Sequence, residues 1–80
     1  MTDINELLKK GRRAELEERV ERLEHQIRTK ITGISVALNE FLVESLAELK
    51  VEEAQVLMQD LVALMDEYRK ALHQIEALGG

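Results

Sequence analysis

Between residues 51 and 78, hydrophobic residues recur at alternating steps of three and four, and the stretch contains neither proline nor glycine. This spacing is typical of a helix that packs along a coiled-coil seam. The seam residues are Ala54, Leu57, Leu61, Leu64, Tyr68, Ala71, Ile75 and Leu78. A second apolar row, Met58, Val62, Met65 and Leu72, lies beside them. Because this face is wider than one neighbouring helix covers, it predicts several helical partners.

The first half of the chain carries a narrower apolar stripe, which begins at Leu16 and continues to Leu49. Two consecutive steps of four lead from Leu23 through Ile27 to Ile31, and we assign Ile31 and Leu38 to this stripe. The stripe keeps its phase across Gly33, so we predict one long kinked helix over residues 12–49. A break at Gly33, which would give a three-helix arrangement, is the alternative, because glycine costs about 1 kcal/mol in a helix relative to alanine.

The apolar phase is lost at Glu52 and Glu53, and acidic residues are typical of the first turn of a helix. We therefore predict a turn at Lys50 and a second helix over residues 52–78. The resulting fold is all-α, an antiparallel helical hairpin, and the alternative is a single helix over 12–78. A turn at Lys50 would place residue n level with about residue 101 − n, so that residues 12–22 overhang the second helix.

Eighty residues without a cysteine make one domain with a marginal core, and oligomerisation is a common way to complete such a core. The sequence therefore predicts a homo-oligomer, a dimer in the first place, in which two hairpins pack antiparallel as a four-helix bundle. The residues predicted to form this interface are Val36, Val43, Met58, Val62, Met65 and Leu72.

Charge divides the chain into a basic start and an acidic remainder. Residues 1–13 carry four basic and two acidic side chains, while the whole chain has a net charge of −5. We interpret residues 1–11 as a short amphipathic, basic arm that ends near Gly11, and residues 12–80 as the hairpin domain. The residues predicted to contact a partner are Lys9, Lys10, Arg12, Arg13, Leu16, Val20 and Leu23. The acidic remainder disfavours general nucleic-acid binding.

Candidate chemistry is sparse. His25 lies four residues after Glu21, and His73 three residues before Glu76, but these pairs fall outside the apolar seam, where solvated surface is the better interpretation. No serine has a histidine at helical spacing, and no glycine-rich phosphate loop is present. We therefore expect no catalytic residues, no metal site and no cofactor. The absence of a long apolar run or a secretory signal predicts no membrane partner and a cytoplasmic protein.

Two resemblances bear on function. Residues 59–68 are similar to the second helix of the small helical-hairpin aspartyl-phosphate phosphatases, which carry a Ser-Gln-Glu-Leu-Asp run. Met58 stands at the serine position and Val62 at the aspartate position, so the resemblance implies no phosphatase activity here. A hairpin that dimerises into four helices is also similar in architecture to the Rop-type RNA-binding modulators of plasmids.

These observations predict a non-enzymatic helical interaction protein, such as an oligomerising adaptor, a cochaperone or an inhibitor, that also binds another protein. A Rop-like regulator that binds an RNA duplex through its basic N-terminal segment is the alternative. In that case the four basic residues Lys9, Lys10, Arg12 and Arg13 would contact phosphates.

Overall fold

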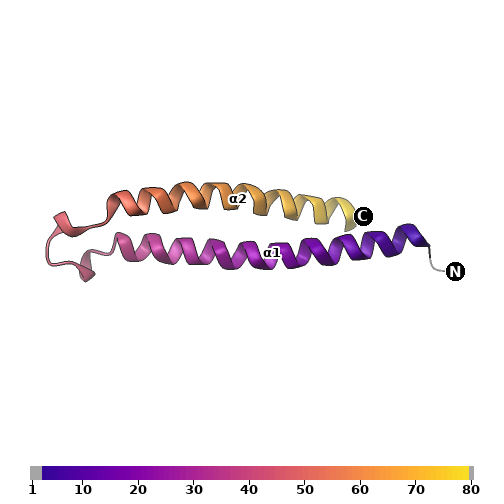
Figure 1. Cartoon of the computed structure of the whole chain (residues 1–80), viewed down its shortest axis with the longest axis horizontal. Helices are drawn as coiled ribbons and strands as arrows, with labels where there is room; N and C mark the ends of the chain where they lie inside the picture. The colour runs from indigo at the N-terminus through magenta and orange to yellow at the C-terminus, as the bar shows by residue number, and fades with distance from the viewer. Residues whose placement is uncertain (1–2, 80) are drawn as a thin grey trace.

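The computed structural model describes residues 3–79, which form a rod of two antiparallel helices measuring 69 × 16 × 15 Å (Figure 1). Helix α1 spans Ile4–Ala37 and helix α2 spans Val51–Gly79. The predicted all-α helical hairpin is confirmed, and the described residues contain no strand. Each helix buries its apolar stripe against the other, which is the simplest way for two amphipathic helices to leave water.

Helix α1 begins earlier than predicted and is continuous. Asp3 caps it, because its side chain accepts a hydrogen bond of 3.0 Å from the backbone N–H of Asn5. The helix then passes through Gly11 and Gly33 without interruption. The predicted end of the arm at Gly11 and the three-helix alternative with a break at Gly33 are therefore not what the structure shows. At Gly33 tertiary packing on both sides outweighs the cost of one missing side chain, whereas Gly11 lies in the part of the helix that extends past α2, and the helix continues there with open space where a Cβ would lie.

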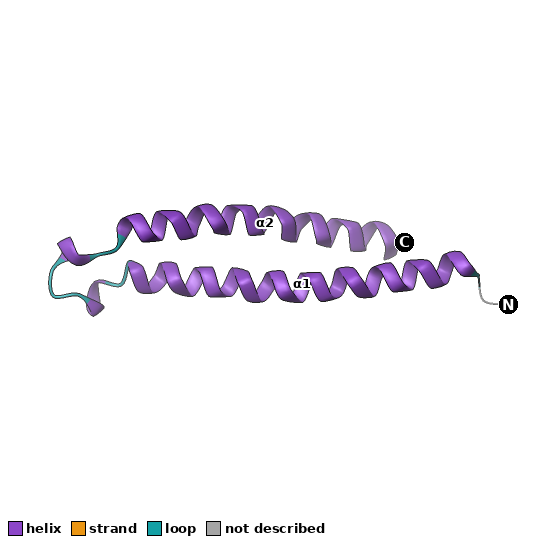
Figure 2. Ribbon diagram, in the orientation of Figure 1, coloured by secondary structure: helices purple, strands orange, loops and turns teal. Residues whose placement is uncertain are grey.

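A loop of residues 38–50 connects the helices and contains two short 3₁₀ turns, Glu40–Leu42 and Leu46–Glu48 (Figure 2). Ser45 and Glu48 form a reciprocal capping box at the second turn. At the base of the loop, the backbone N–H of Lys50 donates to the carbonyl of Ala37 over 3.2 Å. The predicted extension of the first helix to residue 49 is therefore wrong, because local side-chain caps end the helical conformation after Ala37.

The long loop changes which residues face each other. The Lys30 ammonium lies 3.3 Å from the Asp60 carboxylate, and Gly33 lies against the side chain of Leu57. These contacts place residue n of α1 level with about residue 90 − n of α2. The pairing predicted from a turn at Lys50 is therefore wrong by about eleven residues, or about three helical turns.

The core lies along the seam between the helices. In α2, all eight predicted seam residues are buried or half-buried, as expected from their spacing. In α1, the buried residues are Leu16, Val20, Leu23, Ile27 and Ala37. The tightest cluster forms where Val20 and Leu23 meet Ala71.

The overhang of residues 12–22 is not observed, because the open end of the hairpin closes near the start of this segment. There the guanidinium of Arg13 lies next to Gly79. The part of α1 that extends past α2 lies N-terminal to Arg13, at the free end of the rod (Figure 1).

Candidate self-association surface

The most distinctive surface of the hairpin is an apolar flank that runs beside the seam. On α2 its members Val51, Met58, Met65 and Leu72 recur every seven residues. Seven residues make almost two helical turns, so these side chains lie on one side of the helix. Three of the four are exposed, and Met65 is half-buried. Val62 adds to the same side of α2.

The end of α1 and the residue that follows it contribute to this flank near the loop. Ile31 lies on the helix, Leu38 caps its C-terminus seven residues later, and both are exposed. A hollow forms where this part of α1 meets the start of α2. It is lined by Ile34, Leu38, Val51, Ala54, Gln55, Met58, Gln59 and Val62. We define the apolar flank as Ile31, Leu38, Val51, Met58, Val62, Met65 and Leu72.

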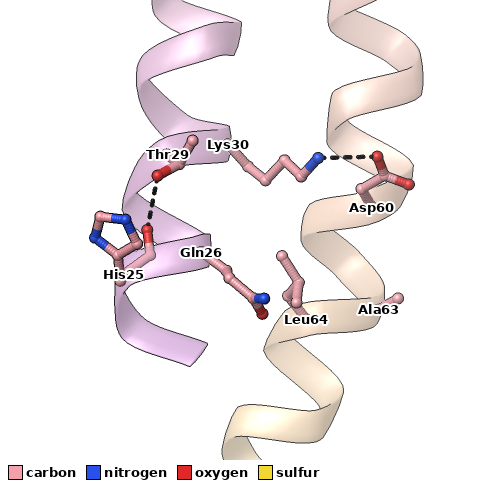
Figure 3. Close-up of a pocket in the computed structure, with 7 residues that line it drawn as sticks. All are labelled: His25, Gln26, Thr29, Lys30, Asp60, Ala63 and Leu64. Atoms are coloured by element: carbon pink, nitrogen blue, oxygen red, sulfur yellow. Dashed lines mark hydrogen bonds and ion pairs between the residues drawn. The ribbon is translucent and has the colours of Figure 1, made fainter. Parts of the chain in front are cut away.

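The opposite flank of α2 is polar. Its residues at the same seven-residue spacing are Glu53, Asp60, Glu67 and Gln74. Asp60 bonds Lys30 across the seam there, and Figure 3 shows this ion pair above a hollow that is also lined by Gln26. On the α1 side of this hollow, the hydroxyl of Thr29 donates to the carbonyl of His25 over 2.9 Å. The two sides of the hairpin are therefore chemically distinct, one lined mostly by polar and charged residues, the other apolar.

The six residues predicted from sequence to form a self-association surface do not lie on one strip. Met58 and Val62 border the apolar hollow, with Met65 and Leu72 further along the same flank. Val36 and Val43 line a different hollow, which shares no residue with the first. Val43 lies in the loop, because α1 ends before it. The apolar flank therefore includes Ile31, Leu38 and Val51 in place of these two valines.

Three of the residues predicted to contact a partner are buried inside the hairpin. Leu16 is 2% exposed, and Val20 and Leu23 are also buried. The register shift explains this, since it brings α2 alongside the segment that was expected to overhang. Their surface is used within the chain and is not open to another protein.

The basic residues predicted to contact a partner remain at the surface. Lys9 and Lys10 are exposed on the overhanging part of α1. Arg12 and Arg13 instead pair with acidic residues of their own helix, Glu15 at 3.8 Å and Glu17 at 3.0 Å. Of the four basic residues in this segment, Lys9 and Lys10 therefore take part in none of the ion pairs observed in residues 3–79.

Within residues 3–79, no group of three or more histidine, aspartate or glutamate side chains could hold a metal ion. Every buried side chain of this part of the chain is hydrophobic. The described residues thus offer an apolar surface for association, and they bring no set of polar groups together in a buried position.

Neither helix in residues 3–79 carries an apolar run of the length that crossing a bilayer requires.

Comparison of the chain with protein-family models, with curated proteins and with solved structures finds no match.

The members of the flank that sequence reasoning missed are Ile31, Leu38 and Val51. The first two were interpreted as seam residues, because two consecutive steps of four lead from Leu23 to Ile31. In the structure the seam continues from Ile27 to Lys30 and then Ile34, with the lysine paired to Asp60. A charged residue at a seam position hid the regular heptad.

Proposed function

We propose that this protein is a non-enzymatic helical interaction protein whose hairpins associate with each other through the apolar flank. Two copies that bury this flank form a four-helix bundle, and the bundle is the form that meets other proteins as an adaptor or inhibitor. The proposal places the basic arm and the loop at the ends of the bundle.

The observation that carries this proposal is the apolar flank itself. Val62 is 66% exposed, and Leu38, Val51 and Met58 beside it are also exposed. Soluble proteins seldom leave such a contiguous patch in water unless it is an interaction site. Full burial of an exposed Val, Leu or Met side chain contributes about 1.5–3 kcal/mol, and these side chains are still 46–66% exposed, so covering the remainder in both copies favours association against its entropic cost.

The narrowness of the hairpin also supports the proposal. Two helices have only one seam, and only seven side chains of the described residues are buried in it. Small domains with so little interior commonly gain stability by oligomerisation. A second hairpin on the flank would turn one seam into the closed core of a four-helix bundle.

Val62→Asp is expected to break this association. A carboxylate in the interface would have to lose its hydration without a partner, so the dissociation constant of the dimer should rise at least about tenfold, which is about 1.4 kcal/mol. Sedimentation equilibrium of the variant and the wild type measures this change, and circular dichroism checks that helix content is retained at a concentration where the variant is still folded.

Val56→Asp provides the matched control. Val56 is on the same helix, is 57% exposed, and does not border the apolar hollow. It lies six residues before Val62, about 120° away around the helix. Its substitution should leave the dissociation constant unchanged. Equal loss of association in both variants would show that the flank has no special role.

A further inference from the structure

The two ends of the rod carry opposite charge. At one end, the overhanging part of α1 carries three basic residues and one glutamate, Glu6; two of the basic residues, Lys9 and Lys10, form none of the observed ion pairs of residues 3–79. At the other end, the loop of residues 38–50 contains three glutamates and one lysine. The glutamates are Glu40, Glu44 and Glu48, and all three are exposed. The ends lie far apart along a 69 Å rod (Figure 1), so they do not neutralise each other within one chain.

We propose that the basic arm of one copy docks on the acidic loop of a second copy, which fixes the two hairpins antiparallel. This inference rests on the proposed self-association and adds the contact that determines its orientation. In the structure the basic arm is the part of α1 that extends past α2, residues 4–12, and the acidic loop is residues 38–50. In a closed antiparallel pair, each arm meets one loop, so the contact forms twice.

The position of the apolar flank leads to the same arrangement independently of charge. On α2 the row of flank residues runs from Val51 to Leu72, so its midpoint lies between Met58 and Met65. A two-fold axis that buries this row against its own copy therefore passes close to the segment between these two residues. Helix α2, Val51–Gly79, is centred on Met65, so an axis at that end of the segment also lets the two α2 helices overlap along their whole length.

The register of the hairpin then places the arm. Residue n of α1 lies level with about residue 90 − n of α2, as the contact between Lys30 and Asp60 shows. With the axis at Met65, residue n of α1 lies level with about residue 50 − n of the second copy. Lys10 is therefore level with Glu40 of the second copy, at the start of its acidic loop.

The side chains are also on the correct side of the helix. Lys10 precedes Ile31 by 21 residues and Leu38 by 28, which are three and four seven-residue repeats. Lys10 therefore lies on the side of α1 that carries the apolar flank. Positive charge on the arm and negative charge on the loop attract across the proposed interface, whereas a parallel pair would place arm beside arm and loop beside loop.

Charge reversal tests the contact in the full chain. The variants are Lys9→Glu with Lys10→Glu in the arm, and Glu40→Lys with Glu44→Lys in the loop. None of these four side chains forms an observed hydrogen bond or ion pair in residues 3–79, so folding should be retained. Each double variant should raise the dimer dissociation constant about tenfold at low salt, because attraction becomes repulsion at both contacts.

The four-fold variant, which carries both reversals, should recover the wild-type dissociation constant, since arm and loop are again opposite in charge. The differences should diminish at high salt. If neither double variant changes the dissociation constant, or if the four-fold variant does not recover it, the arm does not dock on the loop. In that case the effect of Val62→Asp still reports separately on self-association.

Disulfide trapping gives a second, direct measurement, because the chain has no cysteine of its own. Positions 10 and 40 are about 45 Å apart along one hairpin, far beyond the 7 Å limit for a disulfide, so any bond between them joins two chains. A mixture of the Lys10→Cys and Glu40→Cys variants should form the mixed disulfide faster than either variant links to itself. Preferential linking of Lys10→Cys to itself would establish a parallel pair and overturn the proposal.

The alternative partner of the arm is an anionic lipid surface, since the hydrophobic residues Ile4, Leu7 and Leu8 are also exposed there. Cosedimentation of the wild type with vesicles that contain phosphatidylserine examines this outcome. If reversal of Lys9 and Lys10 abolishes vesicle binding but leaves the dimer dissociation constant unchanged, the arm binds lipid and the proposal is wrong.

Discussion

Leu23→Ala is expected to lower the free energy of unfolding by about 2–5 kcal/mol, the range for truncation of a buried leucine. Leu23 is 4% exposed and packs with Val20 against Ala71. Because a domain of this size has few kcal/mol of net stability, the variant should lose most of its helical signal well below the wild-type melting temperature. Thermal and urea unfolding followed by circular dichroism, at one fixed protein concentration, measures the change.

Phe41→Ala is the informative comparison. Truncation of Phe41 to alanine removes more atoms than truncation of Leu23, yet the Phe41 side chain is 88% exposed in the loop. Its truncation should therefore change the free energy of unfolding by less than about 0.5 kcal/mol. A large loss of stability from Phe41→Ala with little loss from Leu23→Ala would support the pairing predicted from a turn at Lys50 and contradict the observed register.

Ala71→Asp is expected to be at least as disruptive. Ala71 is 3% exposed and lies where α2 comes closest to Val20 and Leu23. A carboxylate there would be too large for the gap and would have no positive partner within the cluster. An uncompensated buried charge costs about 3–5 kcal/mol, so the variant should be largely unfolded at room temperature. Circular dichroism and the dispersion of amide signals in a nuclear magnetic resonance spectrum report the loss.

Ala63→Asp separates burial from helix propensity. Ala63 is on the same helix but is exposed, at the edge of the polar hollow beside Asp60. The same chemical change should therefore cost the difference in intrinsic propensity, about 0.7 kcal/mol or less, plus about 0.2–0.5 kcal/mol of repulsion from each of Asp60, Asp66 and Glu67, which is well below the cost at Ala71. If both aspartate variants retain the fold equally well, the seam does not pass through Ala71.

The fold class and the seam of the second helix were predictable from the sequence. In residues 51–78 the steps of three and four are uninterrupted and no glycine or proline competes, so the local and tertiary preferences agree. The structure buries or half-buries every residue of that seam. The apolar row beside it was also identified from spacing alone, although its role in self-association remains a prediction.

The position of the turn was not predicted, and the other errors follow from this one. Phe41, Leu42 and Leu46 continue the hydrophobic stripe in the sequence, yet all three are exposed in the loop. Periodicity cannot distinguish an apolar loop from an apolar helix. A local signal was nevertheless present, because Ser45 is followed three residues later by Glu48, the spacing of a capping box. That signal indicates a new turn and excludes one helix through residue 49.

The heptad of the first helix was hidden by a charged residue. Lys30 occupies the seam position between Ile27 and Ile34, where it pairs with Asp60. Sequence reasoning assigned that position to Ile31, which the structure leaves 48% exposed on the apolar flank. Which residues face each other across a seam depends on how the two helices pack, so the ion pair between Lys30 and Asp60 could be identified only once the register was known.

Sedimentation equilibrium of the wild-type protein at about 10 µM shows directly whether the hairpins associate, since burial of the flank should give a dissociation constant below that concentration. We expect a helical species of twice the chain mass of 9.2 kDa. We also expect a melting temperature that rises with protein concentration, because folding and association are then linked. A stable, fully helical species of 9.2 kDa with a concentration-independent melting temperature would show that the hairpins do not associate through the flank.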